Sequence, residues 1–170
     1  MRLLYLITRA EPGGAQVHLL ELLRGFRDRA ELHLGVGEDQ DGFLVEEARA
    51  LGVRVHLLRH LVQPVRPVKD FRGLFEVMAL LRKVRPHLLH AHSSKAGFLG
   101  RLAGRALGVK SVFTAHGWAF TDGVPEGMKR LARSMERLAG RLGDLVLAVA
   151  EYDRALALRH KVAPPERIRV

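Results

Sequence analysis

The sequence predicts an α/β fold in which helices cover both faces of a doubly wound, mostly parallel sheet. Short apolar runs alternate with segments of helical period along the whole chain. Most of these runs are apolar at consecutive positions, as strands buried on both faces are. Regular alternation of this kind gives a parallel sheet with right-handed crossovers. The length of 170 residues is typical of one domain.

Seven strands and six helices are expected. The predicted strands are Leu3–Thr8, Glu31–Val36, Arg54–Leu57, Leu88–Ala91, Ser111–Ala115, Leu145–Val149 and Arg167–Val170. The predicted helices are residues 15–28, 43–51, 70–84, 95–107, 126–142 and 151–160. Ligands of such sheets bind beyond the carboxyl ends of the strands. The segments to search for a site are therefore residues 9–14, 37–42, 92–95, 116–123 and 150–153.

Two glycines follow the first predicted strand and precede a helix. Gly13 and Gly14 let backbone N–H groups approach an anion, and the helix N-terminus adds a partial positive charge. A phosphate or a sugar hydroxyl would fit there, and an ordinary tight turn is the alternative interpretation. The chain contains no dinucleotide-binding fingerprint and no P-loop motif.

The fourth predicted strand ends in two histidines and leads into a polar helix start. Period two puts His90 and His92 on one face, with His92 at the strand end. For His90, a structural hydrogen bond to a neighbouring loop is the favoured interpretation. Ser93 or Ser94 can cap the next helix. Lys95, in the first turn, opposes the helix dipole, a position best tolerated if an anion binds close by.

The fifth predicted strand ends in His116, Gly117 and Trp118. A histidine at a strand end, a glycine that opens space and aromatic rings that can wall a pocket suit sugar or base recognition. Core packing of Trp118 and Phe120 is the alternative. His116 or His87 could also join the two histidines of the fourth strand in a metal site. Because no carboxylate accompanies them, we expect no metal.

The helix predicted at residues 126–142 is amphipathic and basic. One apolar stripe at helical spacing is expected to face the core: Leu131, Met135, Leu138 and Leu142. A second stripe is cationic: Arg130, Arg133, Arg137 and Arg141. This cationic stripe could lie against anionic lipid head groups, and a solvated surface is the alternative.

Composition excludes several classes of protein. With 48% apolar and 27% charged residues, the chain is not intrinsically disordered. It has no cysteine, which excludes a disulfide scaffold, a cysteine zinc site and a thiol nucleophile. The 28 basic and 18 acidic residues give a net charge of +10, which favours nucleic acid, a phosphorylated substrate or a membrane surface as partner. Genome composition or a hot habitat accounts for the arginines equally well.

Neither a secretory signal nor a membrane-spanning segment is expected. The start of the chain, Met1–Arg9, lacks a long apolar stretch and a small-residue cleavage site. The longest stretch without a formally charged residue, Ser111–Thr121, is far shorter than the roughly 20 residues needed to cross a bilayer. We expect a soluble chain whose membrane contact is peripheral.

Four segments together resemble the N-terminal, acceptor-side domain of GT-B glycosyltransferases of family 4 (group 1), the retaining nucleotide-sugar-dependent group. The segments are Pro12–His18, His90–Gly97, Phe113–Trp118 and Asp144–Arg154. Each motif is modest alone, but the ordered set spans nearly the whole chain. The Ser-Ser-Lys-Ala-Gly and His-Gly-Trp runs are most similar to those of bacterial exopolysaccharide or O-antigen enzymes, which usually extend lipid-linked sugars at the cytoplasmic face of the membrane.

The resemblance implies roles for individual residues. It makes His116 the catalytic residue beside the donor sugar. It places three residues near the donor phosphates and sugar: Gly13, Gly14 and Glu151. It places five on the acceptor side: Gln16, His92, Ser94, Lys95 and Trp118. The family often has serine where this chain has Ala150, so no side-chain contact is expected there. It implies no cofactor and no catalytic metal, with a nucleotide diphosphate sugar as donor substrate.

The resemblance also implies that residues 1–170 form a single Rossmann-like N-terminal domain and that the donor-nucleotide domain is absent from this chain. The expected function is transfer of a sugar to a lipid-linked or saccharide acceptor in cell-surface polysaccharide synthesis, with the isolated domain inactive. Two alternatives stay open. The chain could be a non-catalytic binding or anchoring subunit of a two-chain glycosyltransferase, or a fragment of a GT-B-like nucleotide-sugar 2-epimerase.

The expected partners are the nucleotide sugar, the acceptor, the missing domain and an anionic membrane surface. Nucleic acid is not expected, because no aromatic residues interleave with the arginine stripe of the fifth helix. The expected location is the cytoplasm, peripheral at the inner face of the membrane.

Overall fold

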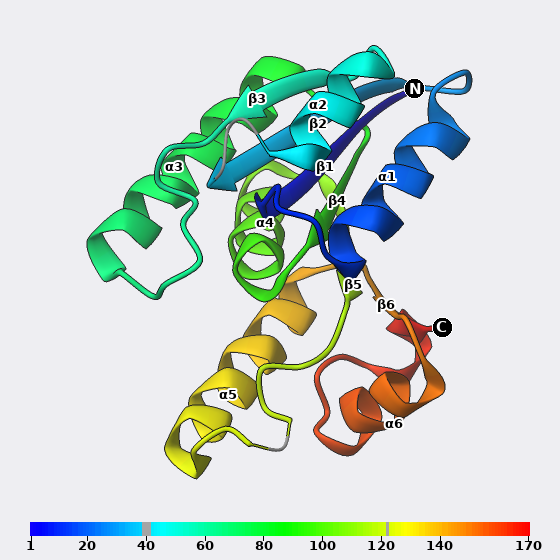
Figure 1. The fold of residues 1–170 in the computed structure, drawn as a ribbon. Coiled ribbons are helices and arrows are strands. Elements are labelled where there is room, and N and C mark those ends of the chain that lie inside the picture. The colour runs from blue at the N-terminus through cyan, green and yellow to red at the C-terminus, as the bar shows by residue number, and fades with distance from the viewer. Residues whose placement is uncertain (39–41, 122) are drawn as a thin grey trace.

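A computed structural model describes residues 1–38, 42–121 and 123–170 of the chain (Figure 1). Parts of the searched segments 37–42 and 116–123 therefore lie outside the described residues. In the described part, seven strands form one parallel sheet in the order β3-β2-β1-β4-β5-β6-β7. The predicted doubly wound fold is confirmed. Strand order changes direction between β1 and β4, and ligands of open α/β sheets bind at such a switch point.

The elements match the predicted ones closely. The strands are β1 (Arg2–Arg9), β2 (Glu31–Glu38), β3 (Arg54–Leu57), β4 (Leu88–His92), β5 (Lys110–Ala115), β6 (Leu145–Ala148) and β7 (Ile168–Arg169). The helices are α1 (Gly14–Phe26), α2 (Phe43–Ala50), α3 (Pro67–Val84), α4 (Ser94–Leu107), α5 (Glu126–Leu142) and α6 (Glu151–Arg159).

Most boundaries shift by one or two residues, and proline explains the shifted starts of α3 and β7. Helix α3 begins at Pro67 instead of residue 70, because proline suits the first helical position, where no intrahelical N–H bond is needed. Arg167 is predicted in the last strand but lies in a 3₁₀ turn, Pro165–Arg167, that follows Pro164. The last strand is therefore confined to two residues.

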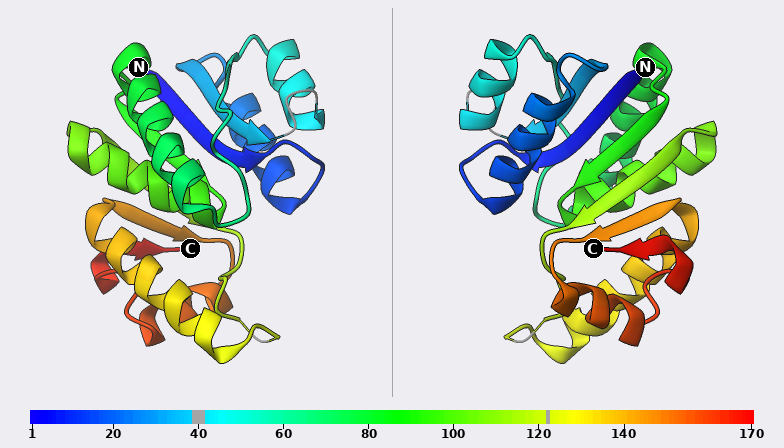
Figure 2. Two further views of the ribbon diagram at one scale, coloured as in Figure 1. Left: turned by 90° about the vertical axis from the view of Figure 1, so that its left-hand side faces the viewer. Right: turned by 90° about the vertical axis from the view of Figure 1, so that its right-hand side faces the viewer.

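Helices cover both faces of the sheet (Figure 2). Helices α1 and α2 pack on one face, and α3 and α4 pack on the other. Strand β1 serves both layers, because Tyr5 and Ile7 join the first and Leu4 and Leu6 the second. Its consecutive apolar residues are thus all buried, which explains why this part of the sequence has the pattern of a central parallel strand.

Helix α5 buries a different face from the predicted one. Leu131 and Leu138 are 59% and 50% exposed, so the prediction that their stripe faces the core is wrong. The buried residues of the helix are Glu136, Ala139 and Gly140. A Cβ on Gly140 would lie 1.9 Å from the carbonyl oxygen of Val162. The small residues therefore mark where the helix comes closest to the rest of the chain.

A buried ion pair joins α4 to α5. Arg101, with no exposed surface, donates from its guanidinium to Glu136 at 2.7 Å and from Nε to the carbonyl oxygen of Gly97 at 2.8 Å. Its guanidinium carbon also lies 4.2 Å from the ring centre of Phe113. Such a pair is costly to break from one side, because the remaining charge is left buried.

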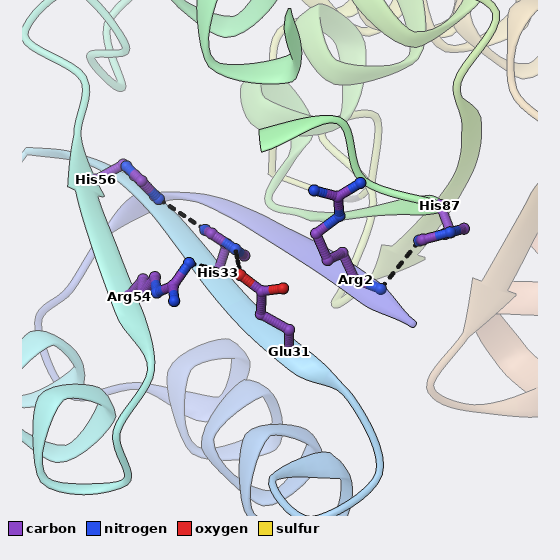
Figure 3. A network of polar contacts seen from close by, with 6 residues as sticks. All are labelled: Arg2, Glu31, His33, Arg54, His56 and His87. Carbon is purple, nitrogen blue, oxygen red and sulfur yellow. Dashed lines mark hydrogen bonds and ion pairs between the residues drawn. The ribbon is translucent and has the colours of Figure 1, made fainter. Parts of the chain in front are cut away.

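A separate polar network lies at the amino-terminal edge of the sheet (Figure 3). His33 Nδ1 lies 2.9 Å from His56 Nε2, and His33 Nε2 lies 3.1 Å from a carboxylate oxygen of Glu31. Arg54 donates to the same carboxylate at 2.5 Å. These contacts tie β2 to β3 at the end of the sheet opposite the ligand-binding edge.

Candidate active site

A cavity of 730 Å³ lies at the carboxyl ends of β1, β4 and β5. Its lining is polar at the strand ends and the helix starts, and mostly apolar further along α4 and α5. The polar lining includes Thr8, Gln16, Ser94 and His116. The apolar lining includes Phe98, Leu99, Met128, Leu131 and Met135. A site of this kind suits a ligand with a polar head and an apolar body.

Charged groups in the cavity wall have partners within the chain. Arg9 donates to the side-chain oxygen of Gln63 at 2.7 Å and also to the carboxylate of Glu11. Glu136 is held by Arg101. Gln16 donates to the carbonyl oxygen of Arg9 at 3.0 Å, which fixes the loop between β1 and α1. The wall is therefore held by its own contacts.

Histidines gather beside this cavity. Leu89 and Ala91 of β4 face α3 and α4, so His90 and His92 face the α1 side, as the period of two predicts. His92 Nδ1 lies 3.0 Å from His116 Nε2. His90 Nε2 bonds the hydroxyl of Thr114 on β5 at 2.7 Å, so this structural bond reaches a neighbouring strand and not a loop.

These histidines are neutral near pH 7. Burial, and then the nearby His18, lowers the pKa of His116 to about 4. Burial also lowers the pKa of His90 to about 4. The pKa of the fully buried His92 lies well below its ordinary value, because burial and then its histidine neighbours disfavour a charge. Each ring therefore offers one donor and one acceptor nitrogen.

The glycine pair opens the start of α1. Gly13 is extended at the N-cap position, and among the described residues no side chain caps the helix. Gly14 is exposed, and a Cβ there would meet no atom within 4 Å. Their neighbours Pro12 and Ala15 line the cavity. The first-turn N–H groups can therefore receive an anion or a sugar oxygen from the cavity side.

Helix α4 begins without the predicted cap. Ser93 occupies the N-cap position with φ of 68°, but its hydroxyl lies 2.6 Å from that of Thr8 on β1, so the prediction of a side-chain cap there is wrong. Lys95 donates to the carboxylate of Asp70 at 2.6 Å and to the carbonyl oxygen of Pro64. The anion that offsets the first-turn lysine is thus supplied by α3.

Trp118 and Glu151 lie outside the cavity lining among the described residues. Trp118 is 3% exposed and donates from its indole to the carbonyl oxygen of Asp153 at 2.9 Å. It stacks on Phe120, so the structure places it in the core and the packing interpretation is the one that fits. Glu151 starts α6 with a 74% exposed side chain that pairs with Arg154 at 3.4 Å.

The cationic stripe of α5 is partly engaged within the chain. Arg133 pairs with Glu126 at 3.0 Å, and Arg137 donates to the carbonyl oxygen of His160 at 2.8 Å. Arg130 and Arg141 are exposed.

An exposed apolar stripe runs along the start of α3. Val65, Val68, Phe71 and Phe75 are 72%, 70%, 64% and 51% exposed. The rings of Phe71 and Phe75 pack edge to face, 4.9 Å apart. Cationic residues alternate with this stripe in the sequence: Arg66, Lys69 and Arg72. Scattered apolar residues are normal on a surface, but a contiguous stripe is typical of an interaction site.

Within the described residues, no helix has the length and apolar character needed to cross a membrane.

The chain matches a known protein family. A model described as Glycosyltransferase Family 4 matches residues 12–170. The chain belongs to this family. The family 4 domain found here confirms the resemblance carried by the four segments of the sequence.

Curated relatives of the family 4 domain are bacterial glycosyltransferases. The UDP-Gal:alpha-D-GlcNAc-diphosphoundecaprenol alpha-1,3-galactosyltransferase of Escherichia coli is 28% identical over 166 residues, which cover 92% of this chain and 43% of the relative. The O-antigen biosynthesis glycosyltransferase WbnH of Escherichia coli is 24% identical over 158 residues, which cover 92% and 44%. The chain thus spans less than half the length of these relatives.

Solved structures share the fold of the family 4 domain. Alr3699/HepE of Anabaena, in complex with UDP and glucose, superposes with a TM-score of 0.76 at 20% identity, over 99% of this chain and 43% of that one. UDP-GlcNAc 2-epimerase of Methanocaldococcus jannaschii superposes with a TM-score of 0.71 at 15% identity, over 99% and 45%. A protein solved with UDP and glucose and a nucleotide-sugar epimerase therefore share this fold, and the family match places the chain in Glycosyltransferase Family 4.

Sequence reasoning missed several residues of the site in this family 4 domain. His18, which approaches both His92 and His116, lies on a helix and carries no strand-end signal. Asp70 is close to Lys95 only through the packing of α3 on α4. The burial of Arg101 could have been predicted, because an arginine four residues after Gly97 falls on the small-residue face of α4.

Proposed function

We propose that this domain is the acceptor-side half of a retaining, nucleotide-sugar-dependent glycosyltransferase. It would transfer a sugar to a lipid-linked or saccharide acceptor in cell-surface polysaccharide synthesis. The observation that carries the proposal is the cavity at the switch point of the sheet, polar at the strand ends and helix starts and mostly apolar further along α4 and α5. A sugar joined to a lipid has this same division of chemistry.

Most of the predicted site residues have a proposed part. His116 contacts the donor sugar, because it is half-buried, neutral and lines the cavity. His92 has no exposed surface, so it acts by holding His116 through their hydrogen bond and not by touching the acceptor. Gln16, Ser94 and Lys95 line the cavity and serve the acceptor side.

Charge neutralisation of the leaving diphosphate is the main electrostatic task of the reaction. In this domain, the open N-terminus of α1 at Gly13 and Gly14 can contribute to it. Glu151 is assigned to the donor by the resemblance alone. The relatives are more than twice as long as this chain, so we place the rest of the donor site in a second domain.

We also propose a peripheral site on the cytoplasmic face of the membrane. The exposed stripe of α3 and an exposed stripe of α5 (Met128, Leu131 and Leu138) carry apolar side chains that would enter the bilayer interface, and neighbouring cations would meet anionic head groups. Arg130 and Arg141 are the exposed members of the predicted cationic stripe. Met128 and Leu131 belong to both the exposed stripe of α5 and the cavity, so the cavity would open toward the membrane.

The test is a transfer assay with the complete enzyme that contains this domain. Purified enzyme receives UDP-galactose, UDP-glucose or UDP-GlcNAc together with a GlcNAc-diphosphoprenol acceptor, and products are identified by mass spectrometry. We expect one donor to extend the acceptor with retained anomeric configuration. Interconversion of the free sugar nucleotide without acceptor would identify an epimerase instead, and absence of both reactions over a wider donor panel would contradict an enzymatic function.

A further inference from the structure

Three histidines from three elements converge beside the cavity. His18 comes from α1, His92 ends β4 and His116 follows β5. One ring nitrogen of each lies within 4.8 Å of those of the other two. Among the described residues this is the group of histidine and acidic side chains placed closely enough to share a metal ion.

The hydrogen bonding of the cluster leaves ring nitrogens without partners. In the described part of the chain, His18 Nδ1 and His92 Nε2 are buried and have no hydrogen-bond partner. His92 is itself fully buried, so its unpartnered nitrogen has no contact with bulk water. A buried polar atom without a partner calls for an explanation, and a bound ion would supply one for His18 Nδ1.

We propose that His18, His92 and His116 bind a divalent transition-metal ion, for which Zn²⁺ is the best fit. Neutral imidazole nitrogen is a preferred zinc ligand, and three protein ligands leave one coordination position open. His116 lines the cavity, which gives the ion a path to the cluster. The site needs no carboxylate or thiolate, because a tri-histidine set is itself an established zinc geometry.

The His92–His116 pair can bind the ion without losing a proton. His92 Nδ1 and His116 Nε2 lie 3.0 Å apart and share one proton. If both nitrogens become ligands, that proton moves to the other nitrogen of the same ring. For His92 this is Nε2, the atom that has no partner in the described structure.

Zinc coordinated by His116 would block the contact between this ring and the donor sugar that the proposed function assigns to it. The ion would then inhibit transfer, and this consequence, unlike the binding itself, rests on the proposed function. Zinc would act as a regulator here, so the site is compatible with catalysis that needs no metal.

The experiment measures zinc binding directly on residues 1–170 by isothermal titration calorimetry, with Co²⁺ absorption as a report on coordination by nitrogen. His18→Gln and His116→Asn each remove one ligand from a half-buried position. We expect one ion per chain, tetrahedral Co²⁺ bands, and at least a hundredfold loss of affinity in either variant, since even ligand-supporting contacts are worth about 10–100-fold.

His56→Asn is the matched control, because it breaks a second hydrogen-bonded histidine pair, which has a carboxylate beside it. This variant should bind zinc like the wild type. Circular dichroism and thermal melting verify that each variant is folded. Equal affinity in His18→Gln, His116→Asn and wild type, or loss of binding in His56→Asn, would overturn the proposal. Zinc binding without inhibition of transfer would instead count against the role of His116 in the reaction.

Discussion

His116 is held in one orientation by His92, and burial keeps it uncharged. A neutral ring so placed can donate to or accept from a sugar hydroxyl without carrying a charge into the site. We expect His116→Ala in the complete enzyme to lower kcat by at least about tenfold, which corresponds to roughly 1.4 kcal/mol in the barrier. Steady-state kinetics with saturating acceptor measure this.

The control for His116→Ala is His87→Ala. His87 is exposed at the amino-terminal edge of the sheet, where it accepts a hydrogen bond from the backbone N–H of Arg2 at 3.0 Å. Its loss should leave kcat within about twofold of wild type. If His116→Ala shows the same small effect, His116 is not part of the site.

The same histidines make stability depend on pH. Their folded pKa values lie below the ordinary value of 6.5, His116 at about 4, so the unfolded chain binds more protons between these values. The folded chain therefore has its full stability above about pH 6.5. Its free energy of unfolding falls as pH drops toward 4, by about 1.4 kcal/mol per pH unit for each extra proton that the unfolded chain binds. Urea unfolding at several pH values measures the slope.

His116→Asn should flatten this slope, because one of the titrating rings is removed. His90 and His92, whose pKa values are also lowered, remain in the variant, so part of the dependence stays. An identical slope in wild type and variant would show that His116 titrates normally in the folded chain.

At the scale of elements, α5 shows what sequence patterns can and cannot predict. Its existence and length follow from helical periodicity, but two stripes compete to be the buried one. Leu131 and Leu138 form the more apolar stripe, and Ala139 and Gly140 the smaller one. The small stripe is buried because the chain around Val162 approaches too closely for larger side chains. That approach is a tertiary property, which no local pattern contains.

Helices α4 and α5 are joined by the buried Arg101–Glu136 pair. We expect Glu136→Gln to lower the free energy of unfolding by about 3–5 kcal/mol, because the arginine charge is left buried without its counter-ion. Urea denaturation measures this. Glu21→Gln, which breaks an exposed pair with Arg24 on α1, should change stability by less than about 1 kcal/mol. Equal effects of the two variants would mean that the buried pair is no stronger than a surface one.

At the scale of the whole molecule, strand order decides which loops meet. The sequence predicts that the strand ends carry the site, and His116, Ser94 and Gln16 do line one cavity. Trp118 follows the same strand as His116 but turns into the core, because Gly117 adopts a φ of 120° that redirects the chain. His18 enters from α1 only because β1 and β4 are neighbours in the sheet. Order along the chain does not fix such neighbours.

At the same scale, the exposed apolar stripe of α3 allows a test of the proposed membrane contact. Phe71 and Phe75 are 64% and 51% exposed, and burying a phenylalanine side chain contributes about 1.5–3 kcal/mol. The double variant Phe71→Ser and Phe75→Ser should therefore bind vesicles of phosphatidylglycerol and phosphatidylethanolamine at least about tenfold more weakly than the wild type does. Co-sedimentation over a range of lipid concentrations measures the partition coefficient. The cations beside the stripe add a second expectation, that binding weakens as salt is raised. Val17→Ser removes an apolar side chain that is 49% exposed on α1, on the other face of the sheet, and should bind as the wild type does. Equal binding by the double variant would show that α3 does not contact the lipid, whereas equal losses in both variants would indicate nonspecific adhesion.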